Sequence, residues 1–163
     1  MAGGGRPEAD VRVVAENRQA RHEYFIDGTV EAGLVLTGTE IKSIREGRVQ
    51  LREAFARVER GEAFLFGMHV APYAFGNRWN HDPTRPRKLL LHREEIAELW
   101  RYARQAGRTL VPLRLYLKRG KAKVELALAR GKRAYDKRRA IAERNQAREP
   151  QRELAGRRGG RVV

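Results

Sequence analysis

Residues 17–25 interleave hydrogen-bonding, cationic and aromatic side chains over a short stretch of sequence. Asn and Arg side chains can hydrogen-bond to base edges and phosphates, whereas His and Tyr rings can stack on unpaired bases. The same pattern also fits the capped start of a strand whose aromatic residues are buried, so composition alone leaves both interpretations open. The candidate RNA contacts in this segment are Asn17, Arg18, Arg21, His22 and Tyr24.

A second group of cations falls on a predicted turn. Lys118, Arg119, Lys121 and Lys123 surround Gly120 and place four positive charges on one tip. These side chains could hold RNA phosphates, or they could form an ordinary solvated turn. Glu31 lies on the polar face of a predicted strand, where it could accept from base amines or simply pair with a neighbouring arginine. The residues by themselves favour the ion pair.

The sequence offers little for catalysis. It contains no cysteine, which excludes disulfides, thiolate metal ligands and cysteine nucleophiles. Ser43 is the single serine and lies outside any Gly-x-Ser-x-Gly motif, and no phosphate-binding glycine loop or His-Glu-x-x-His motif is present. We therefore expect no enzyme, no metal site and no cofactor. The enzymatic alternative is a small RNA-processing nuclease that uses His81 and Asp82.

The charge balance points to a polyanionic partner. The 163 residues contain 35 Lys and Arg against 20 Asp and Glu, which gives a net charge of +15. Arginine outnumbers lysine by 28 to 7, and its planar guanidinium pairs with phosphate and stacks on bases. A GC-rich genome would explain the preference for arginine but not the excess of cations. With no apolar run of about 18 residues and no secretory leader, we expect a soluble, cytoplasmic protein.

The elements that must position these side chains are mostly strands. Apolar and polar residues alternate over residues 29–37, and apolar runs flank two turn signals, as they do in hairpins. Apolar residues at helical spacing predict a helix over residues 93–106. Short antiparallel strands with one packed helix favour a mainly β protein built as a small closed or half-closed barrel. The other expected elements are strands at 22–27, 55–59, 63–70, 113–117 and 124–128, a short helix at 40–46 and a long loop at 71–87.

Composition divides the chain into three parts: a flexible N-terminus (1–15), a barrel domain (16–130) and a basic tail (131–163). The tail carries eleven cations against four anions and few core-forming side chains. Such a segment cannot bury enough apolar surface to offset its ordering entropy, so we expect it to be disordered when free. Its composition over residues 134–149 nevertheless permits a helix.

Several motifs, in order, resemble the SsrA-binding protein (small protein B) family, which partners transfer-messenger RNA in the rescue of stalled ribosomes. The similarity runs from about residue 17 into the tail. It implies an oligonucleotide-binding-like antiparallel β-barrel that grips the tRNA-like domain of that RNA. It also implies a tail that becomes helical on the ribosome and reaches the decoding centre and the vacant messenger channel. The matching segments are residues 17–26, 30–34, 38–43, 61–65, 82–91 and 131–138.

The resemblance also assigns roles to residues. Asn17 and Glu31 would read bases, while Arg18, Arg21 and the cations of the 118–123 turn would hold phosphates. Gln19 stands where the family usually has a second basic residue, and Tyr135 replaces the commoner histidine, with stacking retained. In the tail, Gly131 would be a hinge and Tyr135 the stacking residue. The ribosome-binding set would be Gly131, Lys132, Arg133, Tyr135, Asp136, Lys137 and Arg138.

The implied partners are transfer-messenger RNA and the ribosome, together with alanyl-tRNA synthetase and GTP-bound elongation factor Tu, which act through the charged RNA. No membrane partner is expected. The alternative within the binding class is a generic ribosome-associated or single-strand RNA-binding protein. Such a protein would show strong salt dependence and little preference among RNAs.

Overall fold

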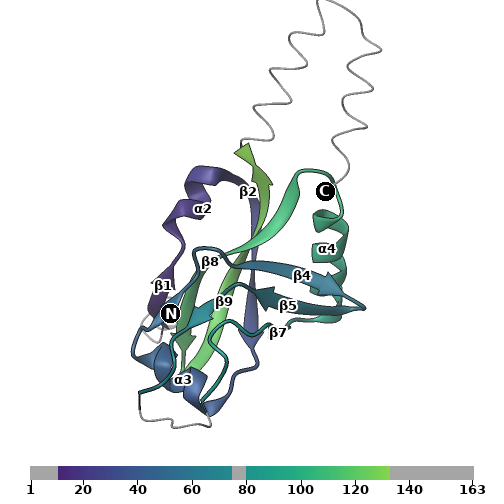
Figure 1. Ribbon diagram of the computed structural model, residues 1–163. Coiled ribbons are helices and arrows are strands. Elements are labelled where there is room, and N and C mark those ends of the chain that lie inside the picture. Colours follow the sequence, from purple (N-terminus) through teal and green to yellow (C-terminus); the bar gives the residue numbers. More distant parts are fainter. Residues whose placement is uncertain (1–10, 75–79, 133–163) are drawn as a thin grey trace, which may run out of the picture.

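The computed structural model describes residues 11–74 and 80–132, which form a β-barrel flanked by helices (Figure 1). The helices are α2 (Arg18–Glu23), α3 (Gly38–Arg45) and α4 (Arg93–Ala103). The strands are β1 (Val11–Glu16), β2 (Tyr24–Leu34), β3 (Val49–Gln50), β4 (Phe55–Glu59), β5 (Glu62–Phe66), β6 (His69–Val70), β7 (Arg87–Leu90), β8 (Arg108–Lys118) and β9 (Lys121–Gly131).

One antiparallel sheet closes on itself to make the barrel. Its strand order is β1-β8-β4-β5-β7-β2-β9, and β9 also pairs with β8, so the ring closes through β8. Two strands pair with the same edge of β8: β1 pairs with its C-terminal half, and β4 pairs with its N-terminal part through Ala56 and Leu110. The predicted mainly β barrel with flanking helices is therefore confirmed. Strands β3 and β6 form a separate two-stranded sheet.

Both predicted hairpins are confirmed, and local turn chemistry explains them. Arg60 and Gly61 join β4 to β5 with φ values of 53° and 78°, and Arg119 and Gly120 join β8 to β9 with 52° and 80°. Two consecutive positive φ angles give a turn whose twist matches that of the flanking strands. The cationic tip at residues 118–121 is consequently a tight turn at the end of the two longest barrel strands.

The segment around residue 20 differs from the expectation. Residues 18–23 form helix α2 and not the start of a strand, and β2 runs unbroken over Tyr24–Leu34. The pairing with β9 shifts between Ile26 and Gly28, so that Asp27 is the extra residue and a single strand spans both predicted ones. Residues 11–15, assigned from composition to a flexible N-terminus, lie in β1 and pair with β8.

The predicted strand over residues 63–70 is interrupted at Gly67. This residue has φ of +77°, and a Cβ placed there would lie 2.6 Å from the backbone carbonyl oxygen of Glu53. The turn shifts the inward pattern by one residue, so Leu65 is buried before it and Met68 after it. An unbroken strand over residues 63–70 would place Phe64, Phe66 and Met68 on one face. That expectation from the sequence was wrong, because the two phenylalanines remain partly exposed while Met68 is buried.

Helices α3 and α4 begin at local hydrogen bonds. Glu40 accepts from the Thr37 backbone N–H at 2.8 Å, and Glu95 accepts from the His92 backbone N–H at 2.9 Å. Each carboxylate satisfies a backbone donor that the first turn of a helix leaves unpaired. These contacts fix the start of two helices that lie outside the barrel. The interior of the barrel is filled by side chains with no exposed surface, such as Leu65, Leu115 and Leu126. Among the described residues, no helix is long and apolar enough to cross a membrane.

A buried ion-pair network attaches the end of the loop at residues 71–86 to the barrel. Arg87 Nε donates to Glu40 Oε2 at 2.6 Å, and neither side chain is exposed. Arg87 also donates to the carbonyl oxygens of Met68 at 2.7 Å and Pro83 at 3.0 Å. Arg85 reaches the same carboxylate at 2.6 Å. The network joins α3, the loop and β7 without leaving Glu40 or Arg87 unpaired.

Candidate nucleic-acid interface

Three neighbouring strands bring the predicted contacts of the barrel onto one outer face. Glu31 of β2 pairs in register with Glu125 of β9, which in turn pairs with Arg114 of β8. Lys123 and Tyr116 pair with each other in the same way, two residues nearer the hairpin tip. Because side chains two residues apart share a face of a strand, these groups lie together on the outside of the barrel.

Glu31 is held as a charged acceptor. The Tyr116 hydroxyl donates to Glu31 Oε2, and Lys118 Nζ lies 3.5 Å from the same oxygen. The hydrogen bond from Tyr116 lowers the pKa of Glu31, with Lys118 adding to the effect and partial burial opposing it. Burial, followed by the bond to Glu31, raises the pKa of Tyr116 and keeps it protonated as a donor. Both of these contacts use Oε2, so that, within the described part of the chain, Oε1 can accept from a donor on a partner.

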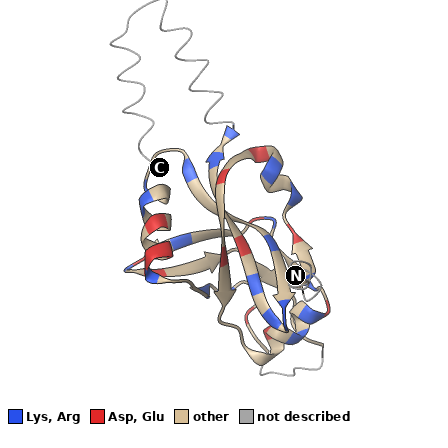
Figure 2. Cartoon of the chain, turned by 180° about the vertical axis from the view of Figure 1, so that it is seen from behind, with Lys and Arg blue, Asp and Glu red and all other residues tan. Residues whose placement is uncertain are grey.

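The cations around Glu31 are interleaved with acids. Arg114 donates to Glu125 Oε1 at 3.0 Å, and its guanidinium lies 4.9 Å from the centre of the Tyr116 ring. Lys118 and Lys123 flank the carboxylate of Glu31, and Lys121 begins β9 beside them. Along these strands β2 carries only acids, β8 carries only cations and β9 carries both, and Figure 2 shows red and blue segments together on this part of the barrel. Such a face can match donors and acceptors as well as attract phosphate.

Asn17 lies at the edge of this face and is mainly internal. It precedes α2 and is only 8% exposed. Its Nδ2 donates to the carbonyl oxygens of Pro112 at 3.1 Å and Leu51 at 3.4 Å, and its backbone N–H donates to Leu113 at 2.7 Å. The amide nitrogen is therefore committed to holding α2 against β8. Only the Oδ1 end remains as a group with which Asn17 could read a base.

Helix α2 presents the other predicted contacts of this segment. Ala20 is buried against Val111, Leu113 and Ala127 on the outer face of the barrel. With that side of the helix packed, Arg18, Arg21 and His22 remain exposed. Their exposure agrees with a role in phosphate contact or stacking, although the segment reaches it as a helix and not as a strand.

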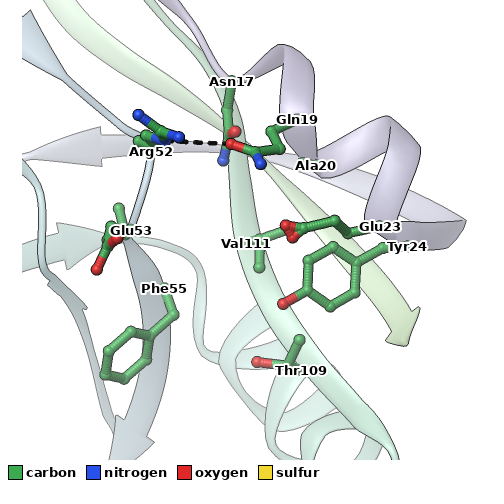
Figure 3. A pocket seen from close by; sticks show the side chains of 11 residues that line it. Asn17, Gln19, Ala20, Glu23, Tyr24, Arg52, Glu53, Phe55, Thr109 and Val111 are labelled. Carbon is green, nitrogen blue, oxygen red and sulfur yellow. Dashed lines mark hydrogen bonds between the residues drawn. The ribbon is translucent and has the colours of Figure 1, made fainter. Parts of the chain in front are cut away.

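A pocket opens between α2, β8 and the start of β4 (Figure 3). Its volume is about 340 Å³. Tyr24 lines it, and burial, together with the neighbouring Glu23, raises the pKa of the Tyr24 hydroxyl. Gln19, which stands where the family usually has a second basic residue, accepts a hydrogen bond from Arg52 Nε at 3.2 Å. The lining residues are Asn17, Gln19, Ala20, Glu23, Tyr24, Arg52, Glu53, Ala54, Phe55, Thr109 and Val111.

The beginning of the predicted tail is attached to the barrel. Gly131 is the last residue of β9, pairs with Tyr24, and donates its N–H to the Gly107 carbonyl at 3.1 Å. Lys132 Nζ donates to the Arg21 carbonyl at 3.1 Å and lies 5.2 Å from the centre of the Phe25 ring. The predicted ribosome contacts Arg133, Tyr135, Asp136, Lys137 and Arg138 lie outside the described residues.

Comparison with known proteins resolves the choice among RNA-binding families. The sequence profile described as SmpB protein matches residues 14–156 of the chain. The chain belongs to the SmpB family. SsrA-binding proteins of Geobacillus thermodenitrificans and Thermobifida fusca are 58% and 59% identical to it over 146 and 147 residues, about 90% of this chain and 94% and 92% of theirs.

A solved structure supports the same placement. It is described as "tmRNA-SmpB: a journey to the center of the bacterial ribosome", and its matching chain is 52% identical to this one with a TM-score of 0.63. The match covers 76% of this chain and 85% of that chain. The resemblance stated from the sequence motifs is therefore confirmed, and the barrel described above is the fold of an SmpB protein.

The histidine considered for a nuclease has a structural role in this SmpB fold. His81 Nδ1 shares a hydrogen bond with Thr39 Oγ1 at 2.8 Å, and Nε2 lies 2.9 Å from the Val70 carbonyl oxygen. Asp82 accepts from the Thr84 backbone N–H at 3.0 Å in a local turn. Both ring nitrogens of His81 are thus occupied in anchoring the loop. Within residues 11–74 and 80–132, no three His, Asp or Glu side chains gather as metal ligands.

One polar cluster of this SmpB protein was missed from the sequence. Asp27 accepts from the Tyr102 hydroxyl at 2.6 Å and from Arg130 Nε at 2.8 Å. The bond from Tyr102, then that from Arg130, lowers the pKa of Asp27. The cluster joins β2, β9 and α4. It lies beside Phe25, and the Arg130 guanidinium is 5.2 Å from the centre of the Phe25 ring. The partners are separated by 75 and 103 residues, so no local pattern could reveal them.

Proposed function

We propose that this chain binds transfer-messenger RNA (SsrA RNA) and acts with it on stalled ribosomes in trans-translation. Family membership supports this function: relatives named for SsrA binding match about nine-tenths of the chain, and the related solved structure contains SmpB with this RNA in a ribosomal context. The observation in the structure that carries the proposal is the outer face of β2, β9 and β8. There Glu31 is fixed and charged beside the half-exposed Lys118 and Lys123, ready to accept from a base amine.

The barrel domain and the tail would have different roles. The RNA-reading set would be Asn17, Glu31 and Tyr24, with Arg18, Arg21, His22, Lys118, Arg119, Lys121 and Lys123 as phosphate or stacking contacts. Residues 133–163 would probe the decoding centre and the vacant messenger channel, with Gly131 as the hinge because it ends the last barrel strand. Charging by alanyl-tRNA synthetase and delivery with GTP-bound elongation factor Tu would follow from the bound RNA. These roles are non-catalytic and belong to the cytoplasm, where bacterial ribosomes work.

The decisive test is competition binding of the labelled tRNA-like domain of transfer-messenger RNA against excess unrelated RNA. Glu31→Ala is expected to weaken specific binding by about tenfold, the order of one lost charge-assisted base contact. Glu62→Ala is the matched control, because Glu62 is also half-exposed and pairs with a lysine, Lys88, at 2.6 Å. Each substitution removes one negative charge, so a non-specific polycation would bind more tightly after either one. Equal or tighter binding by the Glu31 variant would contradict the proposal that the outer face of β2, β9 and β8 recognises this RNA.

The same binding assay distinguishes the role of the barrel domain from that of the tail. A chain ending at Lys132 keeps every described strand and helix, together with the contact from Lys132 to Arg21. This truncation should retain preference for the tRNA-like domain while losing peptide tagging on stalled ribosomes. Normal tagging by the truncated chain would contradict the tail assignment. Equal displacement of both chains by unrelated RNA would favour the generic RNA-binding alternative.

A further inference from the structure

A second hollow lies next to the pocket of Figure 3, between α4, β4 and the start of β8. Its volume is about 390 Å³, and it shares Phe55 and Thr109 with that pocket, so the two hollows adjoin. None of the residues that the family resemblance assigns to RNA lines this groove. Its lining residues are Phe55, Ala56, Arg57, Val58, Trp100, Ala103, Arg104, Gln105, Ala106, Arg108 and Thr109.

The groove exposes aromatic rings that the core does not use. Trp100 is 47% exposed and Phe55 is 39% exposed, whereas the largest apolar side chains of the barrel interior are fully covered. Phe55 stacks on Phe66 with ring centres 5.4 Å apart and planes 17° from parallel. The Arg104 guanidinium lies 4.4 Å from the centre of the Trp100 ring. Two rings held in place and left open to solvent provide ready-made stacking surfaces.

The charge of the groove is entirely positive. Three arginines line it, Arg57, Arg104 and Arg108, and none of the eleven lining residues is acidic. Arg57 pairs weakly with Glu59 at 3.8 Å, where both side chains are about half-exposed. Arg104 forms no ion pair with any described residue, and its guanidinium lies against the Trp100 ring instead. Arg108 lies 5.0 Å from the centre of the Tyr102 ring. The guanidinium groups of Arg57 and Arg104 are therefore open to phosphates, and Arg108 adds a third positive charge to the same groove.

We propose that this groove is a second RNA-binding site, which stacks an unpaired nucleotide on Trp100 and holds its flanking phosphates with Arg57, Arg104 and Arg108. A duplex keeps its bases stacked inside, so only a single-stranded segment can offer a free base together with closely spaced phosphates. An acidic peptide would satisfy the arginines but leave the rings without matching partners. Residues 133–163 carry an excess of positive charge, so their charge does not complement the arginines of the groove. The inference rests on the proposed function in so far as an RNA must be brought to the barrel.

The test uses Trp100 as its own reporter. The chain contains two tryptophans, so Trp79→Phe in the full-length protein leaves Trp100 as the single indole fluorophore. Titration with single-stranded oligoadenylate should quench its emission, because a stacked base contacts the ring. In the same background, Arg104→Ala should weaken oligonucleotide binding by about tenfold, the order of one lost stacking or cation–π contact. Arg101→Ala is the control, since Arg101 is an exposed arginine of α4 outside the groove.

Binding by anisotropy of labelled oligoadenylate then tests the Trp100 ring itself. Trp100→Ala should lose about tenfold in affinity, and Trp100→Phe should recover part of it, which a merely structural role would not predict. Absence of quenching, with oligonucleotide affinity unchanged by Arg104→Ala and Trp100→Ala while the tRNA-like RNA still binds, would overturn the groove and leave the proposed function intact. Quenching by polyglutamate with equal affinity would also overturn it, in favour of an acidic protein partner. Failure of both RNAs to bind would overturn both proposals.

Discussion

Glu40 is a carboxylate with no exposed surface, and it stays charged because of the groups around it. Burial alone would raise its pKa, but hydrogen bonds from Arg85, from the Thr37 backbone and from Arg87 together hold the pKa of Glu40 below its ordinary value. A buried ion pair is costly to desolvate and is retained only when its hydrogen bonds are complete. Here the carboxylate accepts from two guanidiniums and one backbone N–H.

Removing this charge should destabilise the fold. Glu40→Gln leaves Arg87 charged and buried with an incomplete set of partners, which costs about 3–5 kcal/mol in comparable cases. Chemical denaturation at neutral pH should show that loss in the free energy of unfolding. Glu62→Gln is the control, because the exposed pair of Glu62 with Lys88 is worth at most about 1 kcal/mol. A loss below about 1 kcal/mol for Glu40→Gln would contradict the structural role.

The lowered pKa of Glu40 predicts how the stability of the fold changes with pH. Because the folded-state pKa of Glu40 is lowered, its contribution is complete above the unfolded pKa of about 4.3 and is lost as pH falls toward the folded value. The wild-type protein should therefore lose more stability than Glu40→Gln between neutral pH and acid. Parallel curves for the two proteins across that window would show that Glu40 does not supply the acid sensitivity.

At the scale of elements, Gly67 sets where β5 ends and β6 begins. Gly67→Ala forces a left-handed backbone on alanine, at a cost of about 1–2 kcal/mol, and drives the new Cβ to 2.6 Å from the Glu53 carbonyl oxygen. The backbone must then move, so the loss of stability should exceed the conformational cost alone. Thermal denaturation measures it directly.

Substitutions at two other glycines distinguish the energetic cost of the positive φ from the cost of the close contact with Glu53. Gly61 has φ of +78° and open space where a Cβ would project, with no atom within 4 Å, so Gly61→Ala should show the conformational cost alone. Gly28 has the same open space without a positive φ, so Gly28→Ala should change stability little. If Gly67→Ala cost no more than Gly61→Ala, the close approach to Glu53 would be of no consequence.

The same elements show which structure the sequence could predict. Both hairpins were predictable because two adjacent residues, Arg60-Gly61 or Arg119-Gly120, carry the whole turn signal. Helix α2 was not, because its six residues contain a single apolar side chain, Ala20, and so show no helical period. Its position is set by the packing of Ala20 on Val111 and Leu113. The packing of Ala20 and the hydrogen bonds from Asn17 to Pro112 and Leu113 of β8 override the local pattern there.

The site follows the same division. The motifs predicted contacts at Asn17 and Glu31. The Tyr116 hydroxyl that fixes Glu31 lies 85 residues away, and the strand register brings the two together. The structure also gives Asn17 a packing role that its sequence context does not show. Trp100 was assigned to a helix by its spacing, and only the placement of α4 beside β4 reveals that its ring lines a groove.

At the scale of the whole molecule, the barrel carries two separate surfaces suited to RNA. The face around Glu31 mixes acids and bases on β2, β9 and β8, whereas the groove around Trp100 holds arginines without acids. The two share no lining or contact residue. An extended RNA could therefore engage both at once, and each contact would raise the effective concentration of the RNA at the other.

Additivity tests this arrangement. Substitutions at sites without shared partners add in free energy to within about 0.5 kcal/mol, so for transfer-messenger RNA the loss from Glu31→Ala with Trp100→Ala should equal the sum of the single losses. Short oligoadenylate should respond to Trp100→Ala alone, because it need not reach Glu31. Competition binding with each RNA measures both effects. A double variant no weaker than the worse single variant would mean that the RNA never occupies both surfaces together.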